Sequence, residues 1–178
     1  MTEIQEYWFA ARTRDKQEFS VRNYIEKLKT TENLAVDYFL PIKVVTRQLK
    51  NRRKRVEVPI IKNLIFIRAT KQSACDLSNR YGVPLFYMKD LLTRAMLVVP
   101  NKQMDDFMFL MNLDPEGVCL DNENLSVGSK VKVVKGDFAG IEGEVATAAN
   151  KTFVVIRIES ILTASVRVPK SYLKIIEE

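Results

Sequence analysis

The sequence contains no histidine. This absence excludes Ser-His-Asp and Cys-His catalytic groups, HExxH zinc sites and Cys/His zinc fingers, because each of them needs an imidazole. Cysteine is scarce as well: Cys75 and Cys119 lie 44 positions apart, with no Cys-x-x-Cys pair to hold a metal or exchange disulfides. We expect both thiols to stay reduced, as in a cytosolic protein, and we expect no metal or cofactor.

Long hydrophobic runs are also lacking. No apolar stretch of about 18 residues exists that could span a membrane. The first residues, MTEIQEYWF, do not join a basic segment to an apolar one as a signal peptide does. Hydrophobic residues make up 47% and charged residues 28% of the 178 positions, which is typical of globular chains. The composition therefore predicts a soluble, cytoplasmic, non-catalytic protein that does not bind membranes.

The distribution of charge and glycine predicts two domains. Residues 1–112 carry 20 Lys/Arg and 12 Asp/Glu, whereas residues 113–126 carry four acidic residues and no basic one. Residues 127–178 carry 8 basic and 6 acidic residues. Gly82 is the only glycine of the first segment, while residues 128–143 hold four of the six glycines. We predict a first domain at 1–112, an acidic linker at 113–126 and a second domain at 127–178.

The first domain alternates between strand and helix patterns. Its first helix is predicted to bury residues four and three apart: Val21, Ile25 and Leu28. Glu18 and Glu26 each lie four residues from Arg22, a spacing that predicts weak ion pairs. The predicted elements are strands at 7–13, 38–49, 56–69 and 95–100, and helices at 14–29, at 71–80 and after Pro100. This order fits an α+β domain of the ferredoxin-like, split β-α-β type with an added strand.

Two details refine these elements. Pro41, near the start of the strand predicted at 38–49, indicates an edge or a bulge there. The helix after Pro100 is predicted to bury a stripe of residues at helical spacing: Met104, Phe107, Met108 and Met111. Asp105 and Asp106 form the only adjacent acidic pair of residues 1–112, and we assign them to the first turns of that helix, where the dipole favours negative charge.

The second domain has four or five short strand patterns and no helical period. Five strands in about 52 residues are too few for a sandwich with its own core, so we predict a small SH3-like β-barrel. Its turns contain Gly136-Asp137-Phe138 with Gly140 and, further on, Asn150-Lys151. Gly143 allows close packing of the backbone where the next strand begins.

The glycines and valines of this domain also form a recognisable pattern. Their spacing resembles a KOW motif, which comprises Gly128, Val131, Val133, Gly136, Phe138, Gly140, Gly143 and Val145. Together with Trp8-Phe9 on the first strand, an amphipathic helix and a Lys/Arg-rich hairpin, it resembles the N-terminal domain plus KOW domain of the NusG family, over residues 6–176. The stretch 93–111 is most similar to the specialised UpxY paralogues, antiterminators of long capsular-polysaccharide operons. Ile61-Lys62-Asn63-Leu64 replaces the Phe-Pro-Gly-Tyr-like turn of the general factor, which favours a specialised paralogue.

The hairpin between the second and third predicted strands is the sharpest basic feature. Six cations fall within nine residues: Arg47, Lys50, Arg52, Arg53, Lys54 and Arg55. Charges this dense repel one another unless an anionic partner offsets them, so we predict a contact with phosphates that positions the protein and reads no base sequence. A solvated hairpin tip is the alternative. The resemblance places this hairpin near nucleic acid at the upstream edge of the transcription bubble.

A second nucleic-acid surface is predicted on or beside the first helix. It consists of cations and one aromatic residue: Arg12, Arg14, Lys16, Arg22, Tyr24 and Lys27. An aromatic among cations suits stacking with single-stranded bases, and the resemblance implies a contact with the displaced non-template DNA strand. A mixed-charge helix face, partly neutralised by Glu18 and Glu26, is the alternative.

An apolar patch is the candidate for protein binding. It comprises Trp8, Phe9, Ile61, Leu64, Phe66 and Phe86, and the resemblance implies that it binds the clamp helices of the largest RNA polymerase subunit. Strand alternation sends Leu64 and Phe66 to one face and Ile65 and Ile67 to the other. We predict that Leu64 and Phe66 are exposed, the alternative being core packing.

The leading hypothesis is a monomeric transcription elongation and antitermination factor that suppresses pausing. Its KOW domain is expected to bind a ribosomal protein, Rho or nascent RNA, with contacts at Phe138 or the strand at 153–158, although Phe138 as a plug of the barrel is the alternative. A ribosomal RNA-binding protein is a second hypothesis, because such proteins also use KOW barrels. A metal-dependent nuclease would need a carboxylate cluster, and Asp105-Asp106 is the only starting point for one.

Overall fold

The structure is a computed structural model that describes residues 5–120, 126–158 and 161–176. The chain divides into two compact units, residues 1–101 and 102–178. The strongest predicted elements are present at or near their predicted bounds, including the first strand, β1 (Tyr7–Thr13), and the helix α2 (Lys71–Asn79). The predicted linker at 113–126 lies partly outside the described residues.

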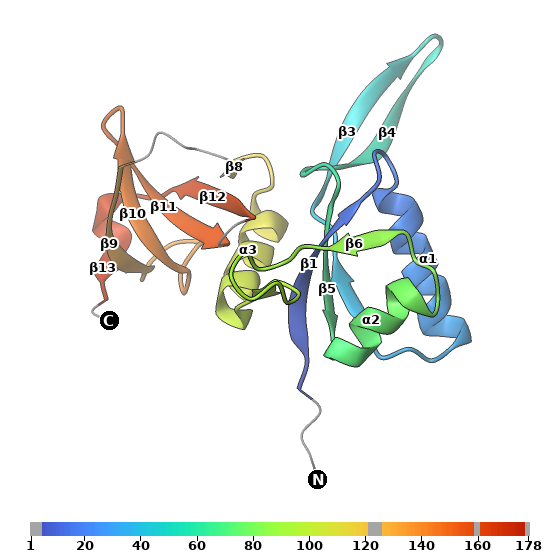
Figure 1. Cartoon of the computed structure of the whole chain (residues 1–178). Helices are drawn as coiled ribbons and strands as arrows, with labels where there is room; N and C mark the ends of the chain where they lie inside the picture. Colours follow the sequence, from blue (N-terminus) through green and yellow to red (C-terminus); the bar gives the residue numbers. More distant parts are fainter. Residues whose placement is uncertain (1–4, 121–125, 159–160, 177–178) are drawn as a thin grey trace. The chain divides into compact units, whose positions relative to one another are not determined.

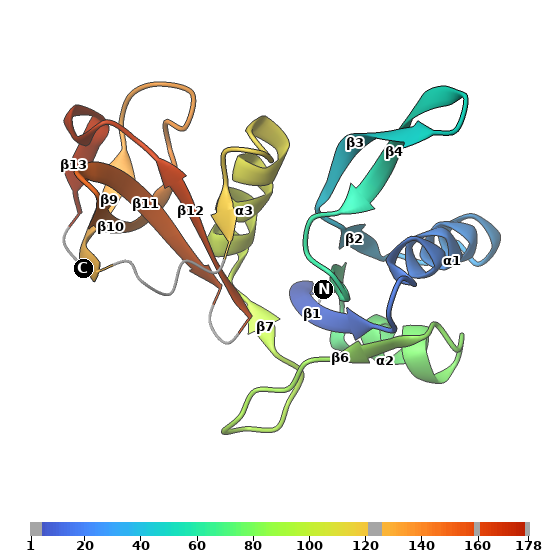
Figure 2. The same ribbon diagram turned by 90° about the horizontal axis from the view of Figure 1, so that it is seen from above.

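The first unit is built on an antiparallel sheet with two helices on one face (Figures 1 and 2). Its strand order is β2-β5-β1-β6, where β2 is Asp37–Phe39, β5 is Leu64–Ala69 and β6 is Leu85–Tyr87; the short β7 (Val98–Val99) also pairs with β1. Apolar side chains of α1 (Glu18–Thr31) and α2 pack on one face of this sheet in a single core cluster. The order agrees with the split β-α-β arrangement predicted from the sequence.

The chain between β2 and β5 forms a separate two-stranded ribbon that is not part of this sheet. It consists of β3 (Ile42–Leu49) and β4 (Arg52–Pro59), paired in register from Ile42 opposite Pro59 to Leu49 opposite Arg52 (Figure 1). We call this ribbon the hairpin arm. The two long strands predicted at 38–49 and 56–69 are therefore each broken in two, at residues 40–41 and at residues 60–63.

Prolines and a turn residue explain these breaks. Pro41 has no N–H to donate, and its carbonyl accepts a bond from the Ile60 N–H at 2.8 Å, which ties the base of the arm together. Asn63 has φ +58°, a left-handed conformation, and it lies in the turn at residues 60–63 that separates the end of β4 from the start of β5. The sequence pattern was right about β structure and wrong about its continuity.

The first helix begins later than predicted. It starts at Glu18, not at residue 14, because Lys16 adopts φ +59° and the Gln17 N–H donates to the Arg14 carbonyl at 3.1 Å in a turn. Its buried side chains include the predicted stripe of Val21, Ile25 and Leu28. Residues 14–17 therefore form an exposed connection between β1 and α1.

The second unit contains the helix that we expected in the first domain. This helix, α3 (Asn101–Leu113), buries Met104, Phe107 and Met111 as predicted, whereas the predicted Met108 is only half-buried and Leu110 is buried in addition. Its Asp106 carboxylate accepts hydrogen bonds from Lys102 Nζ at 2.6 Å and from the Glu142 N–H at 3.2 Å. The bond from the Glu142 N–H, at the start of β10, ties α3 to the second unit's sheet, so Asp106 has a structural role that dipole complementarity alone does not describe.

That sheet has six strands in the order β13-β9-β10-β11-β12-β8 (Figure 1). The bounds are β8 Cys119–Leu120, β9 Ser126–Val133, β10 Glu142–Ala148, β11 Lys151–Ile158, β12 Leu162–Arg167 and β13 Leu173–Ile175, with a short 3-10 helix at Lys170–Tyr172. Within the described residues β13 and β8 form its two edges, so no closed barrel is found. The hairpin turn is Ala149-Asn150, one residue earlier than predicted, and both residues have the positive φ of a type I′ turn.

Candidate binding surfaces

The hairpin arm carries its cations into solvent. All six of the predicted cations are exposed: Arg47, Lys50, Arg52, Arg53, Lys54 and Arg55. Among the side chains that the structure describes, no carboxylate forms an ion pair with any of the six. Among the described side chains, the six cations make one hydrogen bond, from Arg53 Nε to the uncharged amide oxygen Oε1 of Gln48 at 3.2 Å. The arm is therefore an exposed and uncompensated positive surface.

The register of the arm sorts these charges onto two faces. Arg47 lies directly opposite Lys54, and Arg52 lies two residues from Lys54 on the same face. Like charges placed directly opposite each other on paired strands destabilise the pairing. The other face carries Arg53 and Arg55, which lie directly opposite the neutral residues Gln48 and Thr46. Because the repulsion is not relieved within the described part of the chain, an external anion would stabilise the arm.

The base of the arm is tied to α1. Arg22 Nη1 lies 3.2 Å from Glu57 Oε2 on β4, and the guanidinium lies 4.7 Å from the centroid of the Phe19 ring. This ion pair therefore joins a residue of the predicted helix surface, Arg22, to the strand that carries most of the cations of the arm. Sequence reasoning missed Glu57 as a partner because it lies 35 residues away along the chain.

Glu18 does not pair with Arg22, contrary to the helix spacing. Its side chain is buried, and Oε1 accepts a hydrogen bond from the Asn63 N–H at 2.8 Å. This bond fixes the start of α1 against the turn that precedes β5. Glu26 interacts instead with the Tyr38 hydroxyl, and together with burial of that phenol it raises the pKa of Tyr38.

The remaining predicted residues beside the helix are accessible. Arg12, Arg14, Lys16 and Lys27 are exposed, whereas Arg22 is half-buried by its contacts. Tyr24 is partly exposed, and its hydroxyl donates to the Tyr81 carbonyl at 2.8 Å. The Tyr24 hydroxyl is therefore occupied by this bond, while the side chain as a whole remains 38% exposed.

The predicted exposure of Leu64 and Phe66 is wrong. Their side chains are 1% and 0% exposed, and Trp8 and Phe9 are buried too. The register does place Leu64 and Phe66 on the face turned away from α1 and α2, since Ile65 and Ile67 belong to the core cluster that contains those helices. Both strands concerned, β1 and β5, have a neighbour on each side, and Phe66 also packs against Phe39 with ring centroids 6.5 Å apart.

Two members of the predicted apolar patch remain accessible. Phe86 on β6 is 56% exposed, and Ile61 is half-buried. Phe86 pairs with Arg12 across β6 and β1, so the two exposed side chains lie on the same face of the sheet, next to each other. Of the predicted protein-binding patch, Phe86 is therefore the residue that is clearly accessible, and it lies beside the exposed cation Arg12.

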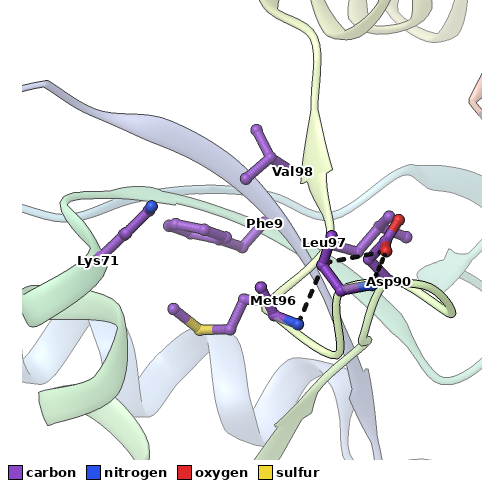
Figure 3. Close-up of a pocket in the computed structure, with 8 residues that line it drawn as sticks. Phe9, Lys71, Asp90, Met96, Leu97 and Val98 are labelled. Carbon is purple, nitrogen blue, oxygen red and sulfur yellow. Dashed lines mark hydrogen bonds between the residues drawn. The ribbon is translucent and has the colours of Figure 1, made fainter.

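A cavity of about 400 Å³ lies beneath the segment that connects β6 to β7. It is lined mainly by apolar residues, including Phe9, Met96 and Val98, and Figure 3 shows Lys71 on one side of Phe9 and Asp90 on the other. The Lys71 ammonium also lies 5.4 Å from the centroid of the Tyr7 ring. Nearby, burial raises the pKa of the Tyr87 phenol.

The same connecting segment exposes two leucines that the sequence prediction passed over. Leu91 and Leu92 are 77% and 93% exposed, more than any other large hydrophobic residue described by the structure. The sequence does contain a feature that could have indicated their exposure. In Lys89-Asp90-Leu91-Leu92-Thr93-Arg94, two leucines stand among polar residues, with no strand or helix period on either side.

The KOW-like residues occupy the positions that their types suggest. Val131 and Val133 are buried, and Gly136 and Gly140 have φ +80° and +99°. A Cβ on Gly143 would lie 2.5 Å from the Val155 carbonyl oxygen, so the close approach of β10 and β11 requires glycine there. Gly128 contacts the half-buried Val145, since a Cβ there would lie 3.3 Å from Val145 Cγ1.

The expected protein contacts of this unit are only partly accessible. Phe138 is half-buried, between the two alternatives of a plug and a free contact. The strand at 153–158 belongs to β11, which is paired on both sides and offers no free edge, so an edge contact there is ruled out. The ammonium of Lys132 lies 3.0 Å from Glu142 Oε1 and lowers the pKa of that carboxyl.

No metal or membrane feature is found in the described residues. They contain no group of three or more His, Cys, Asp or Glu side chains that could hold a metal ion, and Asp105 and Asp106 gain no third carboxylate. Every described helix is too short or too polar to cross a bilayer. Both described cysteines are free thiols.

Comparisons with known proteins agree with this architecture. A model of the family described as "Transcription termination factor nusG" matches residues 6–108. The solved structure of NusG from Thermotoga maritima is similar with a TM-score of 0.51 and 18% identity, covering 97% of this chain and 98% of that chain. At this identity the likeness shows the fold. Spt5 in conformation B of the MjSpt4:Spt5 complex aligns over 96% of this chain and 97% of that chain at 19% identity, with a TM-score of only 0.33. No curated protein matches the chain.

Proposed function

The chain belongs to the NusG family, and we propose that it is a specialised elongation and antitermination factor that binds the clamp of RNA polymerase and suppresses pausing or termination. The long operons of capsular polysaccharide synthesis are the proposed targets, on the similarity of residues 93–111 to UpxY-type paralogues. The proposal has no catalytic step, and it places the factor in the cytoplasm as a monomer that needs no cofactor.

The hairpin arm is the observation that carries this proposal. It projects from a folded sheet six exposed cations that form no ion pair with any described carboxylate, on the part of the chain that matches the family. Six phosphate contacts give a log–log salt slope of about −5 on duplex DNA. Such an arm binds the phosphate backbone of nucleic acid near the polymerase without reading sequence, while Arg12, Arg14 and Lys27 beside α1 provide a second surface for the non-template strand or nascent RNA.

The polymerase contact is proposed at the accessible end of the apolar patch. Phe86, with Arg12 beside it and Ile61 as a further member, offers an aromatic anchor and a cation on one sheet face. Aromatic and arginine side chains are the residues that most often dominate binding energy at protein interfaces. The clamp helices of the largest polymerase subunit are the proposed partner.

The second unit is proposed to be a KOW domain. The left-handed turn at Gly136–Gly140 and the tight contact of Gly143 with β11 support this assignment. Its proposed partners are a ribosomal protein, Rho or nascent RNA. The free edges, β8 and β13, replace the interior strand β11 as the places where another backbone could pair.

The physical effect of such a factor on transcription is a population shift. A protein that binds the closed, elongating polymerase better than the open, paused one favours the closed state by the difference in affinity. A tenfold bias needs only about 1.4 kcal/mol of difference. No covalent chemistry is required for this effect.

The test uses the full-length chain, purified core RNA polymerase and a template with a defined pause and terminator. We expect nanomolar-to-micromolar binding, longer transcripts, and a loss of both with Phe86→Ala. Phe109→Ala is the matched control, because Phe109 is a similarly exposed phenylalanine on α3. Absence of polymerase binding by the folded wild-type chain, together with cosedimentation with ribosomal subunits, would favour the ribosomal alternative.

A further inference from the structure

The segment Met88–Leu97 forms a rigid loop at one edge of the first sheet. Its base is fixed by the bond from the Met88 N–H to the Ala10 carbonyl of β1 at 2.9 Å and by the bond from the Leu97 N–H to the Met88 carbonyl at 2.8 Å. Lys89 and Met96 then pair as an antiparallel bridge. The loop therefore leaves the sheet as a short, paired stem (Figure 2).

The end of this loop is closed by Asp90. The Asp90 Oδ1 atom accepts bonds from the Leu92 N–H at 3.0 Å, the Thr93 N–H at 2.6 Å and the Thr93 hydroxyl at 3.0 Å. The Asp90 N–H donates to the Ala95 carbonyl at 2.9 Å, and the Arg94 N–H donates to the Asp90 carbonyl at 3.0 Å. In this network the carboxylate caps the turn internally, and the backbone of the tip is tied to Asp90 by hydrogen bonds at both its ends.

The ordered tip presents Leu91 and Leu92 to water, at 77% and 93% exposure. Exposed Lys89 and Arg94 flank the two leucines, and no ion pair engages either cation among the described side chains. One oxygen of the neighbouring Asp90 carboxylate, Oδ1, already accepts hydrogen bonds from the Leu92 N–H, the Thr93 N–H and the Thr93 hydroxyl. A fixed apolar pair with a cation on each side is complementary to an apolar pocket whose rim carries carboxylates, because burial and charge pairing then act together.

The location of this tip separates it from the hairpin arm. The arm is inserted between β2 and β5, on one side of the sheet, whereas the loop connects β6 and β7, which both pair with the opposite side of β1. A partner on the leucine tip and a nucleic acid on the arm can therefore bind at the same time. Base stacking needs aromatic faces, which the tip lacks, so we favour a protein partner.

We propose that the Leu91-Leu92 tip is a docking knob that inserts into an apolar, acid-rimmed pocket on RNA polymerase, as a contact additional to Phe86. This inference rests on the proposed function, since it takes the polymerase as the partner. The hydrogen bonds within the loop hold its backbone before binding, which reduces the backbone ordering cost of inserting the two leucines.

The test is equilibrium binding of the full-length chain to core RNA polymerase, with binding to a short DNA duplex measured in parallel. We expect Leu91→Ser/Leu92→Ser to weaken polymerase binding at least about tenfold, because two buried leucines are lost, and to leave duplex binding unchanged. The matched control is Leu113→Ser, a partly exposed leucine on α3. Lys89→Glu/Arg94→Glu tests the acidic rim and should weaken polymerase binding most at low salt, unlike Lys151→Glu/Lys174→Glu, which reverses two exposed charges of the second unit.

The outcomes separate this inference from the proposed function. Equal polymerase binding by wild type and Leu91→Ser/Leu92→Ser would overturn the knob and leave the function standing. No polymerase binding by the wild type would overturn both. A parallel loss of duplex binding would identify a nucleic-acid wedge, and leucine-dependent binding to phosphatidylserine vesicles would identify a membrane contact; either result would overturn the protein-docking assignment. Unchanged circular dichroism of the variant keeps the comparison valid, since both positions lie in solvent.

Discussion

Strands β4 and β5 follow one another along the chain, and the sequence pattern predicts one strand over residues 56–69 that includes parts of both, yet the structure places them in different environments. β5 runs through the middle of the sheet and buries its apolar residues on both faces. β4 pairs only with β3 and exposes its four consecutive cations. The difference shows that a β-branched pattern specifies pairing, whereas burial is set by what lies beside and above the pair. The same contrast separates stability from proposed binding: β5 belongs to the core, and β4 carries the proposed nucleic-acid surface.

The largest expected effect is on the free energy of unfolding, and it tests whether β5 belongs to the core. Ile65→Ala removes a fully buried side chain from the core cluster and should lower the free energy of unfolding by about 2–5 kcal/mol. Val44→Ala on the arm, where the side chain is 50% exposed, should cost less than about 0.5 kcal/mol. Urea unfolding followed by the fluorescence of Trp8, the only tryptophan, measures both. Similar losses for the two variants would contradict the division between core and arm.

The next effect is on nucleic-acid affinity, and it tests whether the cations of β3 and β4 carry the proposed binding. Arg47→Gln/Lys54→Gln removes two directly opposed cations and should weaken duplex DNA binding about 60-fold at 0.1 M salt, with the log–log salt slope smaller by about 1.8. Removal of the repulsion should also stabilise the fold slightly, by a few tenths of a kcal/mol. Lys135→Gln/Lys174→Gln in the second unit is the control of equal charge change. If both variants lower affinity equally, net charge rather than the arm carries the binding.

A smaller effect sharpens the link between the arm and α1. Glu57→Gln removes the partner of Arg22, and the fold should lose at most about 0.5 kcal/mol because both side chains are partly exposed. Nucleic-acid affinity should rise a few-fold, since Arg22 is freed and an opposing carboxylate is removed. Titrations of a short DNA duplex measure this, with Glu32→Gln on the exposed end of α1 as the control. A loss of affinity would mean that the ion pair positions the arm for binding.

The smallest effect concerns the ordered loop, which is exposed like the arm but held by a carboxylate. Hydrogen bonds from Thr93, and then from Leu92, keep the pKa of Asp90 below its ordinary value of 3.8. A carboxyl with a lowered folded-state pKa stabilises the fold above its unfolded pKa and loses that contribution as the pH falls through the folded value. The Thr93 amide signal should therefore shift only below about pH 4, and Asp90→Asn should abolish the shift. A pH-independent Thr93 amide signal in the wild type would contradict the capping role of the Asp90 carboxylate.

Much of the site is readable from the sequence because it rests on local properties. The cations of the arm follow one another along the chain, so any hairpin exposes them, and Gly136 and Gly140 adopt left-handed turns. The stripe of Val21, Ile25 and Leu28 is a local period that one helix satisfies. What misleads is burial across elements: alternation correctly separates Leu64 and Phe66 from Ile65, but it does not say whether the second face stays open.

Composition and spacing therefore suffice for the two parts of the chain, the cationic hairpin and the turns that need glycine, since each depends on residues close together in the chain; the family was indicated by the resemblance of its motifs. The remainder depends on contacts between distant residues. Glu57 pairs with Arg22, Glu18 caps Asn63 and Asp106 holds Glu142 across 35 to 45 positions. Long-range contacts of this kind leave no periodic signal, because a single ion pair or hydrogen bond constrains only two positions, and they become visible only when folding brings the partners together.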